Sequence, residues 1–274
     1  MNNSKNNYDI NDLIYLMQRL RAPEDGCPWD LEQSYKTIVP STIEEAYEVA
    51  DAIEQGDISS LREELGDLLF QTVFYSQLAA EEEHFTLPEV ISGLVEKLVR
   101  RHPHVFPDGT LQSRKGDNLE SSDAVLQQWE EIKSEERAGK GHTSVLDDVP
   151  RAFPALLRAQ KLQKRAARTG FDWGDPVQVF DKFEEEIEEI KQAVASGSKD
   201  HTEEELGDLL FTCVNLVRKM GHDSETALRR ANLKFEQRFR HMESETGAEK
   251  LKSMDGEALE EQWQKAKQAL EKEG

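Results

Sequence analysis

The feature that most constrains this chain of 274 residues is an octapeptide that occurs twice. EELGDLLF stands at residues 63–70 and again at residues 204–211, an offset of 141 residues. Of the 22 positions that precede each copy, only five are identical at the same offset, and three of the five are glutamates. The identical positions are Glu44/Glu185, Glu45/Glu186, Glu48/Glu189, Ala52/Ala193 and Gly56/Gly197. Repeats at a fixed offset indicate duplicated structural units. The sequence therefore predicts a tandem duplication that has kept an acidic pattern while its apolar positions changed.

Helix signals follow one another along both halves, and no alternating β-branched run interrupts them. We expect helices near 10–21, 41–55, 59–82, 86–101 and 122–137, and again near 152–167, 177–195, 203–220, 224–244 and 256–272. A capping-box spacing at Ser41, Thr86 and Thr202 predicts three of the helix starts. The fold class is therefore all-α, with tandem helical-bundle domains at 1–138 and 151–274 and a linker at 139–150.

The bulk charge excludes several classes of partner. Asp and Glu number 55 against 34 Lys and Arg, which gives a net charge of −21. Nucleic-acid binders present basic surfaces and anionic lipid attracts basic segments, so we expect neither as a partner. The sequence has no apolar run of membrane-spanning length and no secretory signal. Its two cysteines, Cys27 and Cys213, lack metal-ligand spacing. These features favour a cytoplasmic protein.

Each copy has the spacing Glu-Glu-x-x-Glu and, on the following helix, Glu-x-x-Asp. Helical residues three and four apart share a face, so two antiparallel helices joined at Gly56 or Gly197 can bring both acidic faces into one pocket. A solvated acidic face is the simpler alternative for a single helix of this kind, but the recurrence of the pattern argues against it. The two sets are Glu44, Glu45, Glu48, Glu64 and Asp67 in the first copy, and Glu185, Glu186, Glu189, Glu205 and Asp208 in the second.

Such a pocket requires a cation, because two carboxylates about 4 Å apart repel each other by roughly 1–4 kcal/mol. All donors are oxygens, and no His or Cys is expected to join them, which favours Mg²⁺, with Mn²⁺ possible. A di-iron bundle would need two Glu-x-x-His segments, and only Glu81 to His84 has that spacing. A metal with an incomplete protein shell can hold phosphate oxygens and activate a water. The pattern therefore predicts hydrolysis of a phosphoanhydride without a P-loop motif.

Basic and aromatic side chains follow each octapeptide at similar spacings. A triphosphate needs cationic side chains for the oxygens that a metal does not reach. The Lys-x-x-x-Arg pairs are Lys97/Arg101 and Lys234/Arg238, followed by the tryptophans Trp129 and Trp263. Each tryptophan either stacks on a base or seals the bundle.

The two copies differ at one cation. Lys182 precedes the glutamates of the second copy, where the first copy has Ser41, so the second pocket offers one more positive charge to phosphate. The segments CPWD (27–30) and GFDW (170–173) pair an aromatic residue with an aspartate ahead of each acidic helix. They either border a base or fix a loop, and we favour the loop.

The combination of EEAYEV, EELGDLLF, CPWD and RRHPHVFPDG resembles the MazG family of nucleoside triphosphate pyrophosphohydrolases, in two copies over almost the entire chain. The resemblance implies a helical bundle that dimerises, and Mg²⁺-dependent cleavage of nucleoside triphosphates between the α- and β-phosphates. It implies that the second copy hydrolyses. The implied metal ligands are Glu186, Glu189, Glu205 and Asp208; the nucleotide contacts are Lys182, Lys234, Arg238 and Trp263; the catalytic candidates are Glu185, Glu204 and Glu205.

The first copy keeps a possible metal set and its own phosphate-binding pair. These are Glu45, Glu48, Glu64 and Asp67, with Lys97 and Arg101. We expect it to bind metal or nucleotide but to turn over poorly. Few polar side chains are obvious readers of base edges, so we expect broad base specificity and a role in clearing nucleotide pools. An acidic helical adaptor and a nucleotide sensor without turnover are the alternatives.

Overall fold

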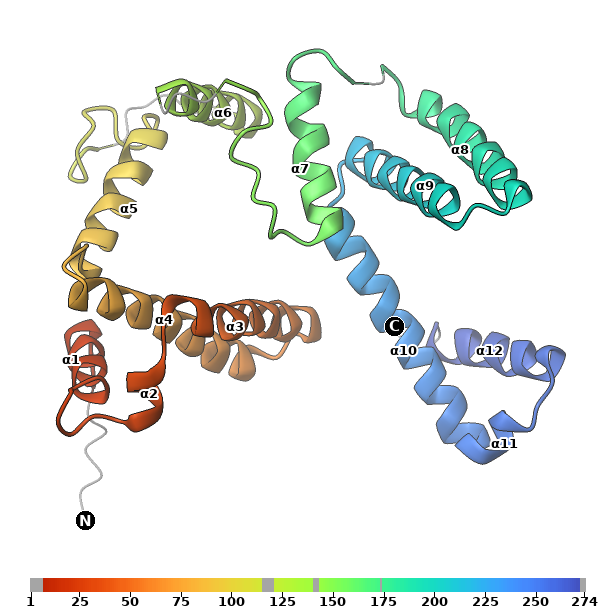
Figure 1. Cartoon of the computed structure of the whole chain (residues 1–274), viewed down its shortest axis with the longest axis horizontal. Helices are drawn as coiled ribbons and strands as arrows, with labels where there is room; N and C mark the ends of the chain where they lie inside the picture. Colours follow the sequence, from red (N-terminus) through yellow and green to blue (C-terminus); the bar gives the residue numbers. More distant parts are fainter. Residues whose placement is uncertain (1–6, 115–120, 140–142, 173, 272–274) are drawn as a thin grey trace. The chain divides into compact units, whose positions relative to one another are not determined.

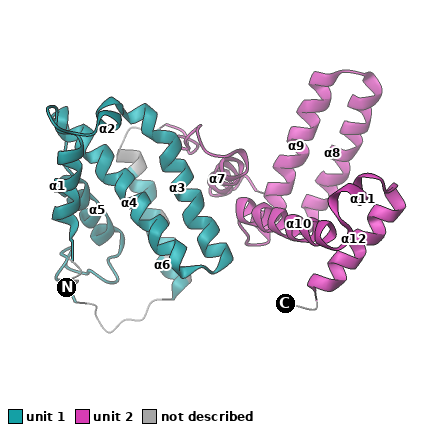
Figure 2. Cartoon of the chain, turned by 90° about the horizontal axis from the view of Figure 1, so that it is seen from below, with its two compact units in different colours: residues 1–136 teal, residues 137–274 magenta. Residues whose placement is uncertain are grey.

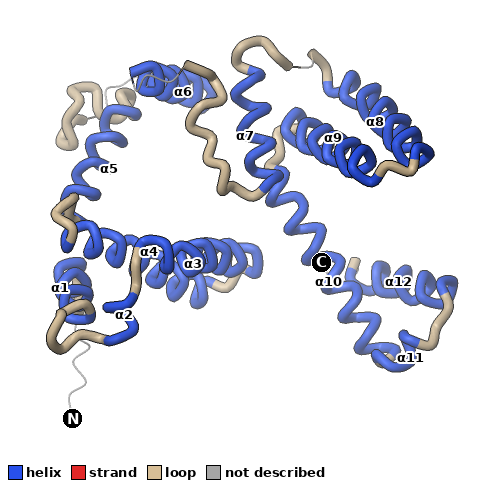
Figure 3. The backbone as a smooth tube through the Cα atoms, in the orientation of Figure 1, coloured by secondary structure: helices blue, strands red, loops and turns tan. Residues whose placement is uncertain are grey.

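The computed structural model describes residues 7–114, 121–139, 143–172 and 174–271, and over these ranges it contains twelve helices and no strand (Figure 3). The all-α fold class is therefore confirmed. Packing divides the chain into two units, residues 1–136 and residues 137–274 (Figure 2). The domain limits expected from the sequence, with a linker at 139–150, stay a prediction.

Unit 1 is organised around one long helical hairpin. The hairpin pairs α3 (Tyr35–Gln55) with α4 (Ile58–Glu81), and α1 (Ile10–Leu20) packs against α4 (Figure 1). The remaining helices are α2 (Pro28–Glu32), α5 (Leu87–Arg101) and α6 (Ser122–Gly139), whose last turn passes into unit 2. The core lies between α1, α3, α4 and the start of α5, and it consists of Met17, Ile38, Val73, Phe74, Leu78 and Leu87.

Unit 2 repeats the hairpin with α8 (Pro176–Ser196) and α9 (Lys199–Lys219). The preceding helix, α7 (Ala155–Ala167), packs against α9, as α1 packs against α4 in unit 1. After α9 the long α10 (Ser224–Thr246) leads away from the hairpin, and α11 (Ala248–Lys252) and α12 (Gly256–Leu270) fold back on its second half (Figure 1). A separate small core of Met242, Leu251 and Ala266 joins these last three helices.

The same turn closes both hairpins. Gly56 has φ +71° and Gly197 has φ +73°, values in the left-handed region that favours glycine at the end of a helix. The next residue caps the following helix: the Asp57 side chain accepts hydrogen bonds from two backbone amides, and the Ser198 side chain accepts one. The identical glycine in the two copies therefore fixes the point at which the chain reverses.

Two of the three helix starts expected from capping boxes are wrong. α3 is capped by Ser34, seven residues before the start that was expected at Ser41. α9 is capped by Ser198 and not by Thr202. In both cases a serine stands earlier in the chain and ends an extended segment, so the helix starts there and runs through the later signal. The third start is confirmed, because Thr86 forms its capping box with Glu89. The short helices α2 and α11 were not expected.

Both hairpins leave apolar side chains uncovered within their own unit. The equivalent pairs Ile53/Val194, Leu65/Leu206 and Leu69/Leu210 all expose at least 44% of their surface. Large exposed apolar patches on a monomeric protein typically mark an interface, whereas single exposed apolar side chains are common. Within the described ranges, no helix is both long enough and apolar enough to span a bilayer.

Candidate functional site

The first copy brings three carboxylates together at the α3–α4 hairpin. Glu45 and Glu48 lie one turn apart on α3, and Glu64 reaches them from α4. One carboxylate oxygen from each lies within 4.8 Å of the other two. The two acidic helix faces therefore meet, and the antiparallel pairing of α3 and α4 is what brings them together.

The carboxylates of the first copy repel one another without a neutralising side chain in the trio. Partial burial, followed by the charges of Asp67 and Glu48, raises the pKa of Glu45. Burial, followed by the charges of Glu48 and Asp67, likewise raises the pKa of Glu64. Asp67 is thus close enough to act on the trio, although it is exposed. A bound cation would relieve this repulsion.

The second copy gathers Glu186 from α8 with Glu205 and Asp208 from α9, again with one oxygen of each within 4.8 Å of the others. Glu186 and Glu205 are the equivalents of Glu45 and Glu64. The third member differs, because Asp208 takes the place that Glu48 has in the first trio. Glu186 is only 3% exposed, which makes it the most deeply buried carboxylate of either site.

Two cationic or basic side chains lie against the second trio. The Lys182 ammonium lies 3.0 Å from a carboxylate oxygen of Glu186 and 3.0 Å from one of Glu185. These bonds raise the pKa of Lys182 above its usual value. His201 Nε2 lies 3.0 Å from Glu205 Oε1. His201 thus bonds one member of the trio, although the described group that could hold a metal consists of carboxylates. The sequence signal for this bond was the four-residue spacing of His201 and Glu205, which places both on one face of α9.

The second trio has the donor set of a site for a hard divalent cation. Glu186 Oε2 is buried and makes no hydrogen bond to any group that the structure describes. A buried carboxylate oxygen without a partner is costly, and a cation would satisfy it. The ligands available are carboxylate oxygens, which Mg²⁺ and Mn²⁺ prefer. The residues present therefore fit a metal of this kind.

The other acidic residues expected at the second site border the trio. Glu189 is half-buried one turn beyond Glu186; burial, followed by the charge of Glu205, raises its pKa, while Lys182 opposes the rise. Glu185 and Glu204 are exposed and adjacent in sequence to members of the trio. Glu44, the equivalent of Glu185, is exposed in the first copy.

One member of the basic pair of the first copy, Arg101, is engaged within unit 1. Arg101 Nε lies 3.2 Å from Glu136 Oε2 on α6, and Arg100 Nη2 lies 2.7 Å from Glu136 Oε1. The hydrogen bond from Arg101, with that from Arg100, lowers the pKa of Glu136 to about 2. Lys97 is half-buried on α5, the helix that also carries Arg101. Arg101 is thus neutralised by a glutamate of its own unit.

The basic and aromatic residues of the second copy lie together on α10 and α12. The Arg238 guanidinium lies 5.7 Å from the centroid of the Trp263 ring and 3.6 Å from Glu271, and Trp263 packs on Phe235. Lys234 is exposed on the same helix. In Figure 1 the second half of α10 and α12 lie away from the α8–α9 hairpin. Within the described residues of one chain, this basic group is therefore separate from the carboxylate trio.

The GFDW segment is held to α9 by its aspartate. Asp172 lies 2.5 Å from Arg218 and 2.8 Å from Lys219. These contacts fix the loop between α7 and α8, the interpretation that we favoured for this segment; Trp173 lies outside the described residues. In CPWD, Asp30 is buried and its carbonyl accepts a hydrogen bond from Arg21, which also pairs with Glu81. Both segments thus anchor the chain ahead of an acidic helix.

Comparison with known proteins places both hairpins in one domain family. The model of the MazG nucleotide pyrophosphohydrolase domain matches residues 33–106 and 177–243, which contain the two trios. The chain is 52% identical over 264 residues to the nucleoside triphosphate pyrophosphohydrolase of Escherichia coli K12, covering 94% of this chain and 97% of that protein.

Two further relatives have related names. The chain is 44% identical over 260 residues to the nucleoside triphosphate pyrophosphohydrolase/pyrophosphatase MazG of Thermotoga maritima, covering 93% of this chain and 94% of that protein. It is 38% identical over 161 residues to the nucleoside triphosphate pyrophosphohydrolase of Mycolicibacterium smegmatis, covering 58% of this chain and 46% of that protein. Similarity to the first two relatives extends across both units.

Proposed function

Because this chain belongs to the MazG nucleotide pyrophosphohydrolase family, we propose that it hydrolyses nucleoside triphosphates to a nucleoside monophosphate and pyrophosphate at the α8–α9 hairpin. The observation that carries the proposal is the trio of Glu186, Glu205 and Asp208, with an unpartnered buried oxygen on Glu186. Its oxygen donors favour Mg²⁺, with Mn²⁺ as the substitute. The substrate would be any of several nucleoside triphosphates, which suits the clearing of nucleotide pools.

The residues of the hairpin divide the chemistry between them. Glu186, Glu205 and Asp208 supply oxygen ligands, and Glu189 stands one turn away to complete the set. A divalent cation in such a site polarises phosphate oxygens and lowers the pKa of a bound water. Glu185 and Glu204 are exposed beside the trio, and one of them is proposed to orient the attacking water. His201 holds Glu205 through the bond of 3.0 Å.

Lys182 can bond either to carboxylates of the hairpin or to a phosphate oxygen of the substrate. In the described structure it neutralises Glu186 and Glu185. If a bound cation neutralised Glu186, the ammonium would be available to a phosphate oxygen, to which Lys is suited as a point charge. Lys234, Arg238 and Trp263 are proposed to contact the nucleotide as well.

The first copy is proposed to bind a cation or nucleotide and to turn over poorly. Its trio of Glu45, Glu48 and Glu64 has no counterpart of Lys182, and Arg101 is bound to Glu136. The first copy therefore offers a triphosphate one lysine fewer, and its Arg101 is held more closely by Glu136 than Arg238 is held by Glu271, at 3.6 Å. A regulatory or binding role for the first hairpin follows from this difference.

A homodimer is proposed because apolar side chains of each hairpin are exposed within its unit: Ile53, Leu65 and Leu69 in the first, and Val194, Leu206 and Leu210 in the second. A second copy of the chain offers the same side chains, and such a matched pair of surfaces suits a two-fold interface. A dimer could also bring Lys234 and Arg238 of one copy to the carboxylates of the other. We further propose a cytoplasmic location and no nucleic-acid or membrane partner, in keeping with the charge of −21.

The test is product analysis with each nucleoside triphosphate and Mg²⁺. Monophosphate with pyrophosphate is expected, and diphosphate with phosphate would contradict the proposed position of cleavage. Bound nucleotide without product would favour a sensor, and neither binding nor product would favour an adaptor. Asp208→Asn should abolish product formation, whereas Asp200→Asn, on the first turn of the same helix, is the matched control and should not.

A further inference from the structure

Unit 2 contains a cavity that the carboxylate chemistry does not use. It has a volume of about 240 Å³ and lies where α7, the GFDW loop and α9 meet. Its exposed walls are almost entirely apolar. Phe171 from the loop and Phe211 from α9 line it, and they are 75% and 40% exposed. It is therefore a preformed hollow with aromatic side chains at its border.

Two buried amides line this cavity without their full set of partners. Asn215 is 1% exposed, and neither its Nδ2 nor its Oδ1 makes a hydrogen bond within the part of the chain that the structure describes. Gln163 donates from Nε2 to the carbonyl of Phe211 at 2.8 Å, and its Oε1 is likewise buried and unpartnered among those residues. Each unmet buried polar group costs about 1–3 kcal/mol. Native proteins seldom bear this cost without a ligand or other use for the groups.

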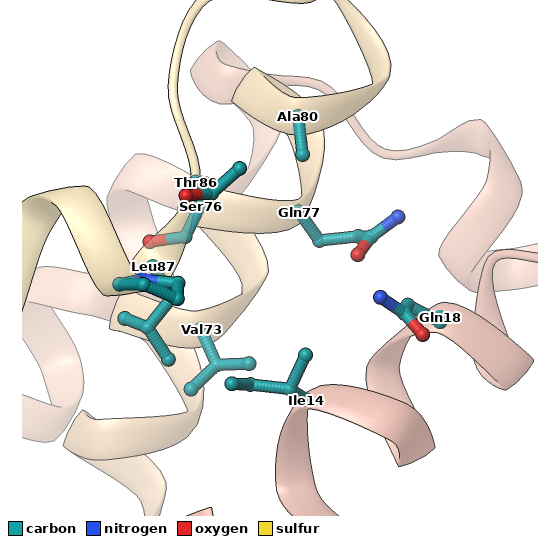
Figure 4. A pocket seen from close by; sticks show the side chains of 9 residues that line it. Ile14, Gln18, Val73, Ser76, Gln77, Ala80, Thr86 and Leu87 are labelled. Atoms are coloured by element: carbon teal, nitrogen blue, oxygen red, sulfur yellow. The ribbon is translucent and has the colours of Figure 1, made fainter. Parts of the chain in front are cut away.

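The equivalent position in unit 1 is filled and apolar. Phe74 occupies the place of Asn215, is fully buried, and packs under the guanidinium of Arg21 at 5.4 Å. A cavity of unit 1 that borders α4 lies on another side of this helix, between α1 and the start of α5, with a volume of about 230 Å³. Gln18 and Gln77 face each other across it above an apolar floor (Figure 4). The pairing of a hollow with a buried asparagine is thus a property of unit 2.

The cavity lies far enough along α9 from the carboxylate trio for one nucleotide to reach both. Asn215 follows Asp208 by seven residues on α9, which places it about 10 Å further along the helix and within about 20° of the same face. Phe211 lies between them, one turn from each. In a nucleotide, the sugar separates the phosphate chain from the base by a span of this order. A ligand whose phosphates reach the trio can therefore direct its base along α9 toward Asn215.

We infer that this cavity takes the base of the nucleotide, with Asn215 hydrogen-bonding a base edge and Phe171 and Phe211 contacting the ring. The inference rests on the proposed function, whose phosphate site it extends. An amide offers one donor and one acceptor side by side, the pairing that base edges also offer. Rotation of the amide by half a turn exchanges the two, so the same residue can serve bases with opposite patterns. Every base has a face for aromatic contact. Broad base specificity is then compatible with a defined pocket.

The test compares wild type with Asn215→Leu, which keeps the branched outline of the side chain and removes the amide. Michaelis constants are measured for ATP, GTP, CTP and UTP, together with the inhibition constant for inorganic pyrophosphate, which has phosphates but no base. We expect the Michaelis constants to rise roughly 5- to 100-fold, the value of one bidentate base contact. The pyrophosphate constant should stay within twofold. Gln160→Leu is the control, because its amide bonds to Ser224 on the same unit, outside the cavity.

A second variant guards against a folding defect. Ala166→Phe fills the cavity from α7 while leaving Asn215 in place, and it should raise the same Michaelis constants without affecting pyrophosphate. Unchanged constants in both variants would overturn the inference, as would an equal weakening of nucleotides and pyrophosphate. If wild type cleaves no nucleotide, the proposed hydrolysis fails separately. Calorimetric titration of the same nucleotides then decides the base pocket, which is rejected if Asn215→Leu binds them as wild type does.

Discussion

The two hairpins have the same helix–turn–helix arrangement, the same glycine at the turn and the same octapeptide. They differ in the side chains that neutralise their carboxylates. In the α3–α4 hairpin, burial and then mutual repulsion raise the pKa of Glu45 and Glu64, and the trio has no lysine or histidine bonded to it among the described residues. In the α8–α9 hairpin, Lys182 and His201 are bonded to members of the trio. The comparison teaches that duplicated ligand patterns need not give equivalent sites, because a single added cation changes the charge that a metal or phosphate meets.

The same contrast extends into the packing beneath each hairpin. Unit 1 places Phe74 at a fully buried position, whereas unit 2 places Asn215 there beside a cavity. A phenylalanine contributes packing and nothing for a polar ligand to bind. Unit 1 therefore has a filled core at the point where unit 2 has an unmet polar group beside a cavity.

The largest expected effect is on turnover. Glu205→Gln should lower the rate of pyrophosphate release by more than about 100-fold, because loss of a group that merely supports a metal ligand already costs about 10- to 100-fold. Glu64→Gln, at the equivalent position, should change the rate less than about twofold. The measurement is steady-state release of pyrophosphate at saturating nucleotide. Equal losses in the two variants would break the ranking of the copies.

The second prediction is a difference in sign. Without metal, Glu186→Gln should lower the free energy of unfolding by about 1–3 kcal/mol, because Lys182 loses a charged and buried partner. Glu45→Gln should raise it by a few tenths of a kcal/mol, because one of several like charges is removed. Scanning calorimetry in the presence of EDTA measures both. If the two substitutions shift stability in the same direction, internal charge compensation is not what distinguishes the hairpins.

The third prediction concerns acid. Glu136 has a pKa lowered to about 2 from an ordinary 4.5, so its ionised form stabilises the folded state above pH 4.5. That contribution, roughly 1 kcal/mol for a partly exposed ion pair, is lost as the pH falls from 4.5 toward 2. Glu136→Gln should therefore be less stable than wild type at pH 7, and the gap should close below pH 4.

Its counterpart in unit 2 provides the control for this measurement. Arg238 lies 3.6 Å from an exposed Glu271, a looser pair. Glu271→Gln should have nearly the same thermal midpoint as wild type at each pH from 7 to 3. If the stability difference from wild type changes with pH in the same way for both variants, Arg101 is not held more tightly in unit 1 than Arg238 is in unit 2.

The smallest effect is expected at His201. His201→Ala should raise the Michaelis constant for nucleotide about two- to threefold, because Glu205 loses an exposed bond that orients it. The Ser60→Ala substitution, at the equivalent place in unit 1, should have no effect on this constant. Rescue of His201→Ala by higher Mg²⁺ concentration would support a role in positioning the ligand, and an unchanged constant would remove His201 from the site.

Much of the hairpin was predictable because its signals are local. Helical periodicity places Glu45 with Glu48 and Glu205 with Asp208, and Gly56 and Gly197 mark the turns, so the meeting of the acidic faces follows from spacing alone. Which three carboxylates come closest was not predictable, since it depends on how the two helices rotate against each other. The bond from Lys182 to Glu186 was likewise missed, although Lys182 itself was singled out.

Features that depend on contacts between distant segments were not readable from the sequence. Asn215 sits in a leucine-rich run and has the pattern of an ordinary buried helix position; only the packing of α7 against α9 shows that its amide is enclosed beside a cavity. The engagement of Arg101 by Glu136, 35 residues later, depends on where α6 lies. The helix starts at Ser34 and Ser198 were missed because several capping residues compete along the same segment.

The glycine turns have a consequence for how this chain can vary. Gly56 and Gly197 reverse direction with no spare residue before the next helix is capped. One residue inserted between Gly197 and Glu205 within α9 would swing every later side chain by about 100° around the helix axis relative to the turn. Insertions and deletions in the hairpins should therefore be far more damaging than substitutions. The number of residues between the turn and the carboxylates matters as much to the site as the identity of those residues.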